Sequence, residues 1–285
     1  MLETTNSAAA IESRSIFTSQ AEQLVPTPLA RGPWYPNSQH GSAMLGLLAR
    51  AVERHEAERP MQVVRLVVDL NKAAPMDAVT TPTRCVRSGK NVEIVEADIE
   101  VNGTVFATAR ALRIRIADID VSHHENGRWT PPPHGPPPST EGRSQLLPLV
   151  EGEAFHHAVD IRATRDPAER ALWFRLRCPL VAGEPVSPLV RTAALADWSY
   201  SVPTIACEIR HGAMLPRTIA TINPDAAIHI HRPLVGEWLC MDSDVHYGPH
   251  GAGSANARLY DERGAIGHTS QSILIRELEE QPLHV

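Results

Sequence analysis

The chain has 285 residues, which suffices for one large domain or for two domains of about 100–150 residues each, and its 42% hydrophobic and 21% charged residues are ordinary for a protein with a buried core. The net charge of −6 and the lack of any Lys/Arg run exclude the basic surface that nucleic-acid-binding proteins carry. No stretch approaches the roughly 18 consecutive apolar residues of a membrane span.

Two further features of the sequence bear on the cellular compartment of the protein. The first 19 residues include Glu3 and Glu12 and have no apolar core, so we expect a short mobile leader at residues 1–14 rather than a signal peptide. The four cysteines lie far apart and show no metal-binding spacing, which favours reduced, mostly buried thiols. Together these features predict a cytoplasmic protein without a metal site.

A proline-rich segment divides the chain. Six of the twelve residues from Trp129 to Thr140 are proline, which lacks a backbone N–H and fixes φ, so this segment can form neither a helix nor a central strand. We therefore expect a linker at residues 121–149 between an N-terminal domain (15–120) and a C-terminal domain (150–285). The two halves are similar in size, which suggests an internal repeat.

The first half is predicted to form one helix followed by antiparallel strands. Apolar residues at i, i+3, i+4 spacing predict a helix over residues 38–58, with Ser38 as its N-cap and with Gly41 and Gly46 allowing close packing. Strands are expected at residues 62–70, 79–88, 92–101 and 104–116. The dipeptide Asn102-Gly103 is typical of a type I′ hairpin turn.

The second half repeats this order after two short strands at residues 154–162 and 171–180. Ser187 and Pro188 predict the start of a helix over residues 187–200. Strands are then expected at residues 226–231, 238–246, 255–260 and 265–276, with a turn at 261–264. The pattern predicts an α+β duplication. If the two sheets pair edge to edge, the pairing covers one exposed edge of each.

Several short motifs resemble those of the type II acyl-CoA thioesterases. In the C-terminal half they are His231-Arg232-Pro233, Glu237-Trp238-Leu239, Gly253…Tyr260-Asp261…Gly264 and Gln271…Arg276; in the N-terminal half they are Trp34…Asn37…Gln39-His40-Gly41 and Arg87-Ser88-Gly89-Lys90. The resemblance covers residues 15–118 and 150–278. It implies a double hotdog, two tandem domains that each wrap a curved antiparallel sheet around one long helix, and it implies a homo-oligomer.

The resemblance also implies hydrolysis of an acyl-CoA thioester, without a cofactor. Members of the family position a water with a carboxylate, a hydroxyl residue and a glutamine. Carried over by motif, the carboxylate is Asp225 and the glutamine is Gln271. The hydroxyl position holds His246, which departs from the family pattern. This histidine could replace the hydroxyl or act as the base, because the ordinary pKa of histidine is about 6.5.

The predicted roles agree with the chemistry of a thioester, whose carbonyl is electrophilic and whose thiolate is a good leaving group. Water then needs orientation and modest base assistance, for which Asp225 could accept the proton and Gln271 could hold the water or donate to the oxyanion. Unpaired N–H groups at the start of the first helix would face the developing charge. The expected substrate-binding residues are Gln39, His40, Gly41, Arg87 and Lys90.

Alternatives to this assignment stay open. The altered position of His246 also fits a non-catalytic protein that binds acyl thioesters, and an aryl or polyketide thioester is a further possible substrate. The thiol carrier could be CoA or an acyl carrier protein. Asp225 follows Asn223-Pro224 and so also fits a turn. Asp197, within the second predicted helix, could cap a loop or face the active cleft.

Overall fold

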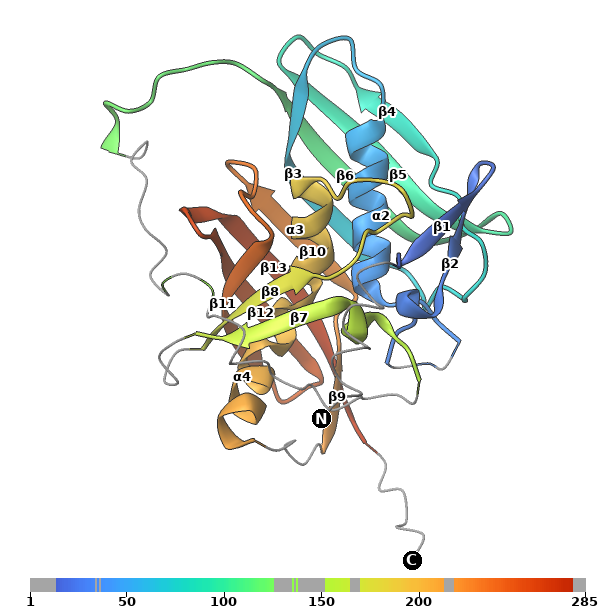
Figure 1. The fold of residues 1–285 in the computed structure, drawn as a ribbon, viewed down its shortest axis with the longest axis vertical. Helices are drawn as coiled ribbons and strands as arrows, with labels where there is room; N and C mark the ends of the chain where they lie inside the picture. Colours follow the sequence, from blue (N-terminus) through green and yellow to red (C-terminus); the bar gives the residue numbers. More distant parts are fainter. Residues whose placement is uncertain are drawn as a thin grey trace, which may run out of the picture.

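One antiparallel sheet runs through both halves of the protein. The structure, a computed structural model, describes residues 14–33, 35, 37–125, 135, 137, 152–164, 170–212 and 218–278. Its large sheet has eleven strands in the order β4-β5-β6-β3-β10-β13-β12-β11-β8-β7, with β9 paired to β13 (Figure 1). All of the leader expected at residues 1–14 except its last residue, and most of the predicted linker, lie outside the described residues.

The N-terminal half contributes one helix and four strands of this sheet. They are α2 (Gly41–Arg54), β3 (Met61–Leu70), β4 (Thr83–Arg87), β5 (Val92–Val101) and β6 (Thr104–Arg115). The predicted hairpin turn is confirmed, since Asn102 and Gly103 have φ values of 50° and 74°. The predicted N-cap was wrong. The hydroxyl of Ser38 donates to the Tyr35 carbonyl, and the side chain of His40 instead accepts from the amide of Ser42.

The C-terminal half contributes the remaining strands and the second long helix. Its elements are η4 (Phe155–Ala158), β7 (Val159–Ala163), β8 (Ala171–Leu176), α3 (Pro188–Ala196), η5 (Asp197–Ser201), α4 (Val202–His211), β9 (Ile219–Ile222), β10 (Asp225–Ile230), β11 (Trp238–Tyr247), β12 (Ala252–Asp261) and β13 (Gly264–Glu277). The predicted N-cap of α3 is confirmed, because the Ser187 hydroxyl accepts from the amide of Val190 at 3.1 Å. The predicted strand at 154–162 begins as a 3-10 turn.

Several short elements were not predicted from the sequence. They are β1 (Phe17–Gln20), β2 (Gln23–Pro26), η1 (Pro28–Ala30), α4 and β9. The strands have four residues each, too few for a periodic pattern to stand out. The prediction ended the second helix at residue 200, whereas α3 ends at Ala196 and the chain continues through η5 into α4.

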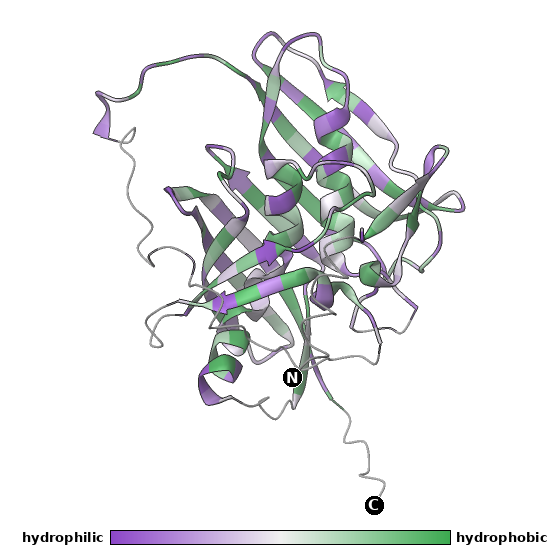
Figure 2. Cartoon of the chain, viewed as in Figure 1, coloured by the Kyte–Doolittle hydropathy of each residue, from purple (hydrophilic) through white to green (hydrophobic). Residues whose placement is uncertain are grey.

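The two halves join where β3 pairs with β10, from Asp69 opposite Asp225 to Arg65 opposite His229. The predicted edge-to-edge pairing is therefore confirmed, and the fold is a double hotdog. In Figure 1, α2 and α3 lie side by side against the sheet. Apolar and polar residues alternate along its strands in Figure 2, so one face packs on the helices and the other faces outward.

The two helices pack closely because α2 is narrow at Gly46. A Cβ atom there would lie 3.0 Å from a methyl carbon of Leu180 and 3.4 Å from Cβ of Ala194 in α3. At the N-terminal end of α2, a Cβ on Gly41 would lie 3.0 Å from both carboxylate oxygens of Asp197. The helices therefore run antiparallel, and the start of α2 meets the end of α3. Buried apolar side chains make up most of this contact, and the hydrogen bond between Ser42 and Asp197 adds a polar contact at its end.

Gly267 is the tightest point of the sheet. A Cβ at this position would lie 1.9 Å from the backbone oxygen of His229, beside the junction of the two halves. We expect Gly267→Ala to lower the free energy of unfolding by about 2 kcal/mol or more, because β10 would have to move. Denaturant unfolding measures this. Ser270→Ala on the same strand serves as the control and should stay within about 0.5 kcal/mol.

Candidate active site

A buried carboxylate lies where the two helices meet. Asp197 follows directly on α3, and the residue is only 2% exposed. One carboxylate oxygen accepts from the Ser42 hydroxyl at 2.8 Å, and the other accepts from the Asn223 amide at 2.8 Å. Ser42 belongs to the N-terminal half and Asn223 to the C-terminal half, so this one carboxylate connects both halves.

Gln271 of β13 lies against the same segment and is 3% exposed. The Tyr200 amide, which can only donate, lies 3.2 Å from the side-chain oxygen of Gln271, and the Ser199 hydroxyl donates to that oxygen at 2.6 Å. The Gln271 nitrogen donates to the backbone carbonyl of Asp197 at 3.1 Å. These contacts fix the orientation of the amide and leave its second N–H available to a ligand or water.

The N-terminus of α2 adds backbone donors beside Asp197. The amide of Ser42 bonds Nδ1 of His40, and the amides of Ala43 and Met44 bond the His40 carbonyl. The amide of Gly41 is the first of the helix and has no acceptor in the described part of the chain. A glycine here also keeps the approach to the Asp197 carboxylate free of a side chain.

His40 is held between two aromatic rings. Its ring centroid lies 4.8 Å from that of Phe155 and 5.5 Å from that of Trp198, both nearly parallel. Nδ1 lies 3.0 Å from the Ser42 amide and 3.5 Å from the Asp197 carboxylate. Since the backbone amide must donate, Nδ1 accepts and the proton of the neutral ring is on Nε2.

The environment of Asp197 favours the ionised carboxylate. Burial opposes ionisation, but the hydrogen bonds that the carboxylate accepts from Asn223 and Ser42 outweigh it and hold the pKa of Asp197 below its ordinary value. The positive end of the α2 dipole acts in the same direction. The site therefore combines an ionised carboxylate, an oriented amide and a free backbone N–H, which together can activate water next to a polarised carbonyl.

The structure brings together part of the predicted set. Gln271, His40 and Gly41 contribute to this site. Gln39 lies in the chain leading to α2, where it is buried and donates to the Pro75 carbonyl at 2.7 Å. Arg87 and Lys90 are exposed at the end of β4 and in the turn that follows, with no contact to this polar cluster among the described residues.

Asp225 and His246 lie on the other face of the sheet. Strand register places both in one row with Ser272 and Ser254, and Ser272 adjoins Gln271 on β13, so its side chain points the opposite way. Asp225 accepts from the Ser272 amide at 2.6 Å. The structure therefore does not bring either residue into the cluster with Gln271.

The site contains four polar residues that the sequence prediction did not assign to catalysis. They are Asp197, Asn223, Ser42 and Ser199. Asp197 had a detectable signal, since it is an acid in the apolar run Ala193–Trp198, where a charge requires partners. Asn223 resembled a turn residue before Pro224. Its contact with Asp197 spans 26 residues of sequence, a relation that no local pattern reveals.

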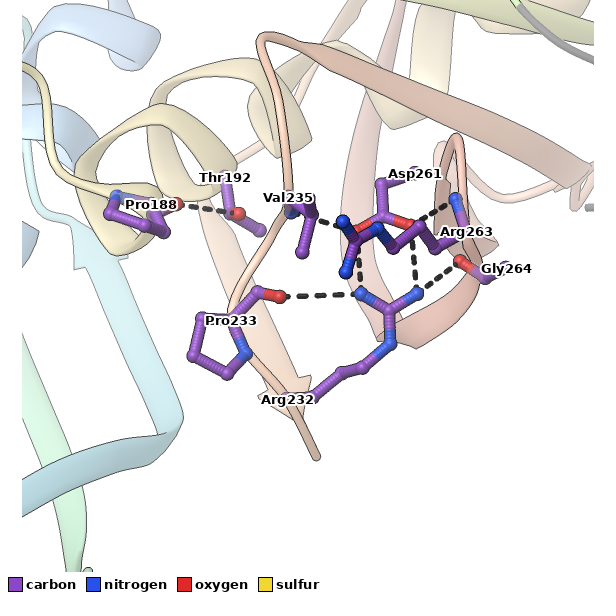
Figure 3. Close-up of polar contacts among 8 residues, drawn as sticks. All are labelled: Pro188, Thr192, Arg232, Pro233, Val235, Asp261, Arg263 and Gly264. Atoms are coloured by element: carbon purple, nitrogen blue, oxygen red, sulfur yellow. Dashed lines mark hydrogen bonds and ion pairs between the residues drawn. The ribbon is translucent and has the colours of Figure 1, made fainter. Parts of the chain in front are cut away.

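The motif residues of the C-terminal half build a structural clasp. Asp261 is fully buried, and its carboxylate accepts hydrogen bonds from both terminal guanidinium nitrogens of Arg232, at 2.5 and 2.7 Å. Figure 3 shows its carboxylate also accepting from the amides of Val235 and Arg263, each at 2.8 Å. Burial opposes ionisation of Asp261, but Arg232 and these amides outweigh it and lower the pKa of the carboxyl. Arg232 also donates to the Gly264 carbonyl, which ties β10 to the β12–β13 turn.

A pocket of about 250 Å³ lies next to this clasp. It is lined mainly by apolar side chains, among them Met61, Val63, Leu189, Ile230 and Leu234. It opens between the start of α3 and the end of α2, whereas the Asp197 cluster lies at the other end of the helix pair. None of its lining residues belongs to that cluster.

Removing the carboxylate of the clasp should destabilise the fold. We expect Asp261→Ala to lower the free energy of unfolding at neutral pH by about 3 kcal/mol, because Arg232 would keep a charge without its partner. Because the folded pKa is depressed, the carboxylate stabilises the protein above the unfolded pKa of about 3.9, and this is lost as the pH falls. Denaturant unfolding of wild type and variant between pH 7 and pH 3 would contradict this if their difference stayed constant.

Comparisons with known proteins agree with the geometry. Residues 30–114 match the family model of the acyl-CoA thioesterase N-terminal domain, and residues 125–275 match that of the C-terminal domain. No curated protein matches the chain. None of the helices in the described ranges has the length and apolar content that a membrane crossing requires.

Three solved structures share the fold. A provisionally named thioesterase from Novosphingobium aromaticivorans is 18% identical, with a TM-score of 0.67, and the match covers 91% of this chain and 98% of that one. Acyl-CoA thioesterase II TesB2 from Mycobacterium marinum is 17% identical (TM-score 0.61; 95% and 99%). A protein from Alicyclobacillus acidocaldarius described as having a hot dog fold is 15% identical (TM-score 0.61; 94% and 98%). With both family models matched across this double hotdog, the chain belongs to the acyl-CoA thioesterase family and is a thioester hydrolase.

Proposed function

We propose that the enzyme hydrolyses an acyl-CoA thioester with a water that Asp197 activates and that Asn223 and Gln271 help to position. The observation that carries this proposal is the buried contact between Gln271 and the Asp197 segment, beside the free amide of Gly41. A carboxylate, an oriented amide and a backbone donor converge there from three parts of the chain. Family membership supports acyl-CoA as the substrate class.

The chemistry follows from what each group can donate or accept. Water attacks the acyl carbon and gives one proton to the Asp197 carboxylate, while the carbonyl oxygen takes up negative charge. The Gly41 amide, at the positive end of α2, donates to that oxyanion. When the intermediate collapses, the carbon–sulfur bond breaks and the thiolate takes the proton from Asp197. The products are the free acid and CoA, and the carboxylate is restored.

Gln271 serves to orient the water rather than to carry the proton. Its oxygen is held by Ser199 and Tyr200, so its nitrogen must present the remaining N–H to the oxygen atom of the water. Asn223 holds one Asp197 oxygen in the same way. This proposal retains Gln271 from the sequence prediction and moves the carboxylate from Asp225 to Asp197. Asp225 and His246 remain predictions that an experiment must test separately.

Substitutions should show which of the two candidate carboxylates, Asp197 or Asp225, acts as the base. We expect Asp197→Asn and Gln271→Ala each to lower kcat/KM at least about a hundredfold, the scale of losing one positioned catalytic group. The matched control is Asp225→Asn, which makes the same change on the other face of the sheet and should stay within about threefold. The measurement is release of free thiol from acyl-CoAs of short, long and aryl acyl groups.

A loss caused by Asp225→Asn with full activity of Asp197→Asn would overturn the assignment of the base. The alternative, a binding protein without turnover, makes a different prediction. In that case no acyl-CoA of the panel would be hydrolysed by the wild type, while saturable binding of the same compounds would persist in equilibrium titrations.

The pH dependence of kcat/KM should also identify the base. Because the pKa of Asp197 is held below its ordinary value, it stays ionised above pH 5, and kcat/KM should be flat between about pH 5 and pH 7. A histidine base would instead make kcat/KM fall as the pH is lowered, with a midpoint near the ordinary histidine pKa of about 6.5. A rate profile measured with one saturating and one limiting acyl-CoA concentration distinguishes the two.

A further inference from the structure

His40 has a second ring nitrogen that its role as N-cap does not use. At the start of α2 the helix needs only an acceptor for the Ser42 amide, and Nδ1 of His40 supplies it at 3.0 Å. A serine or an asparagine meets the same need with a smaller side chain, and such residues are the common N-caps. Capping therefore accounts for Nδ1 but leaves the rest of the imidazole ring unexplained.

The ring of His40 is held on both faces. Phe155 and Trp198 stack on it with centroids 4.8 and 5.5 Å away and with interplanar angles of 24° and 17°. Phe155 is fully buried, and Trp198 is 9% exposed. Because both faces are packed and Nδ1 is bonded to a helix amide, the ring keeps one orientation and the direction of its Nε2–H is fixed by the fold.

This Nε2–H lies at the edge of the polar cluster. It has no acceptor among the described residues, and the His40 side chain is 13% exposed. Nδ1 lies 3.5 Å from the Asp197 carboxylate, and Nε2 is one ring width further away. The next residue is Gly41, whose amide also has no acceptor in the described part of the chain. The site therefore holds two neighbouring N–H groups that are available to a ligand, one from the backbone and one from a ring.

A second donor meets a need of the proposed reaction. As water adds to the acyl carbon, the carbonyl oxygen becomes an anion, and oxyanions in enzymes are stabilised by sets of donors from backbone amides and from side chains that include histidine. The Gly41 amide supplies one donor. A neutral ring suits the role of the other, because an imidazolium beside Asp197 would pair with the carboxylate that has to accept the proton from water.

We propose that His40 is a catalytic residue whose Nε2–H donates, together with the Gly41 amide, to the oxygen of the acyl carbonyl as this becomes an oxyanion. No proton leaves the ring in this step. Asp197 still takes the proton from water and returns it to the thiolate, so the balance of the reaction is unchanged. The inference rests on the proposed function, since it needs the reacting carbonyl to lie beside Asp197.

Two substitutions separate capping from donation. His40→Asn keeps a side-chain oxygen where the Ser42 amide needs an acceptor, but it places no donor at the position of Nε2. We expect it to lower kcat at least about a hundredfold, the scale of losing one oxyanion donor, and to leave KM within about threefold. Its melting temperature should stay within about 2 °C of that of the wild type, because the cap is retained.

His40→Gln makes the opposite change. Its longer side chain carries an amide nitrogen to about the position of Nε2, while glutamine is not a preferred N-cap. We expect kcat to be at least about tenfold higher than in His40→Asn, and the melting temperature to be about 3 °C lower than in the wild type. His55→Asn, the same change at the other end of α2, is the matched control and should keep kcat and KM within about threefold.

The carbonyl group provides a readout that needs no turnover. A ketone analogue of the acyl-CoA, with a methylene group in place of the sulfur and a carbon-13 label in the carbonyl, gives an infrared band that moves to lower frequency when the oxygen accepts hydrogen bonds. In His40→Asn this band should lie at higher frequency than in the wild type, and in His55→Asn it should not move. Kinetics are measured as thiol release from the acyl-CoA that the wild type hydrolyses fastest.

Three results for His40→Asn would overturn the proposal: an unchanged kcat, an unchanged infrared band, or a raised KM with kcat unchanged, which would make His40 a residue that only binds the substrate. Asp197→Asn tells this failure from failure of the proposed function. If His40→Asn is fully active while Asp197→Asn is not, only the role of His40 is wrong. If both variants are fully active, the reaction takes place elsewhere and both proposals are wrong.

Discussion

The arrangement depends on one buried carboxylate that lies where the two halves of the chain meet. Asp197 is placed at the negative end of α3, an unfavourable position for an anion, and is stabilised by the opposing N-terminus of α2 and by donors from both halves. Burying an ionised carboxylate costs folding free energy unless both of its oxygens accept hydrogen bonds. That requirement explains the glycine at residue 41, the hydroxyl at residue 42 and the amide at residue 223 together.

The alternation of side chains along a β-strand separates the two faces of the sheet. Gln271 points inward to the helices and Ser272 points outward, one residue further along β13. A displacement of one residue along a strand therefore moves a side chain from the proposed catalytic site to the outer face of the sheet. Asp225 lies on the outward side of this boundary, although its sequence position is close to that of Asn223, which points inward.

The sequence predicted the fold better than the site, for physical reasons. The helices and the long strands carry periodic apolar patterns, and Ser187, Asn102 and Gly103 mark boundaries through local chemistry. The site has no such signal. Asp197 meets Ser42 across 155 residues and Gln271 meets Ser199 across 72, so only the packing of two halves brings them together. The motif that contains Arg232 and Asp261 indicated the family, and its role in the structure is to tie strands together. It lies away from the polar cluster, so it gave no information about the site.

The location of the reacting carbonyl tests this account most directly. A crystal structure of the enzyme with an acyl-CoA analogue, in which a methylene group replaces the thioester sulfur and prevents hydrolysis, would place that carbonyl. We predict that its oxygen lies within hydrogen-bonding distance of the Gly41 amide, with the Asp197 carboxylate and the Gln271 amide on the side from which water attacks. A carbonyl bound beside Asp225 or His246, on the outer face of the sheet, would contradict the account.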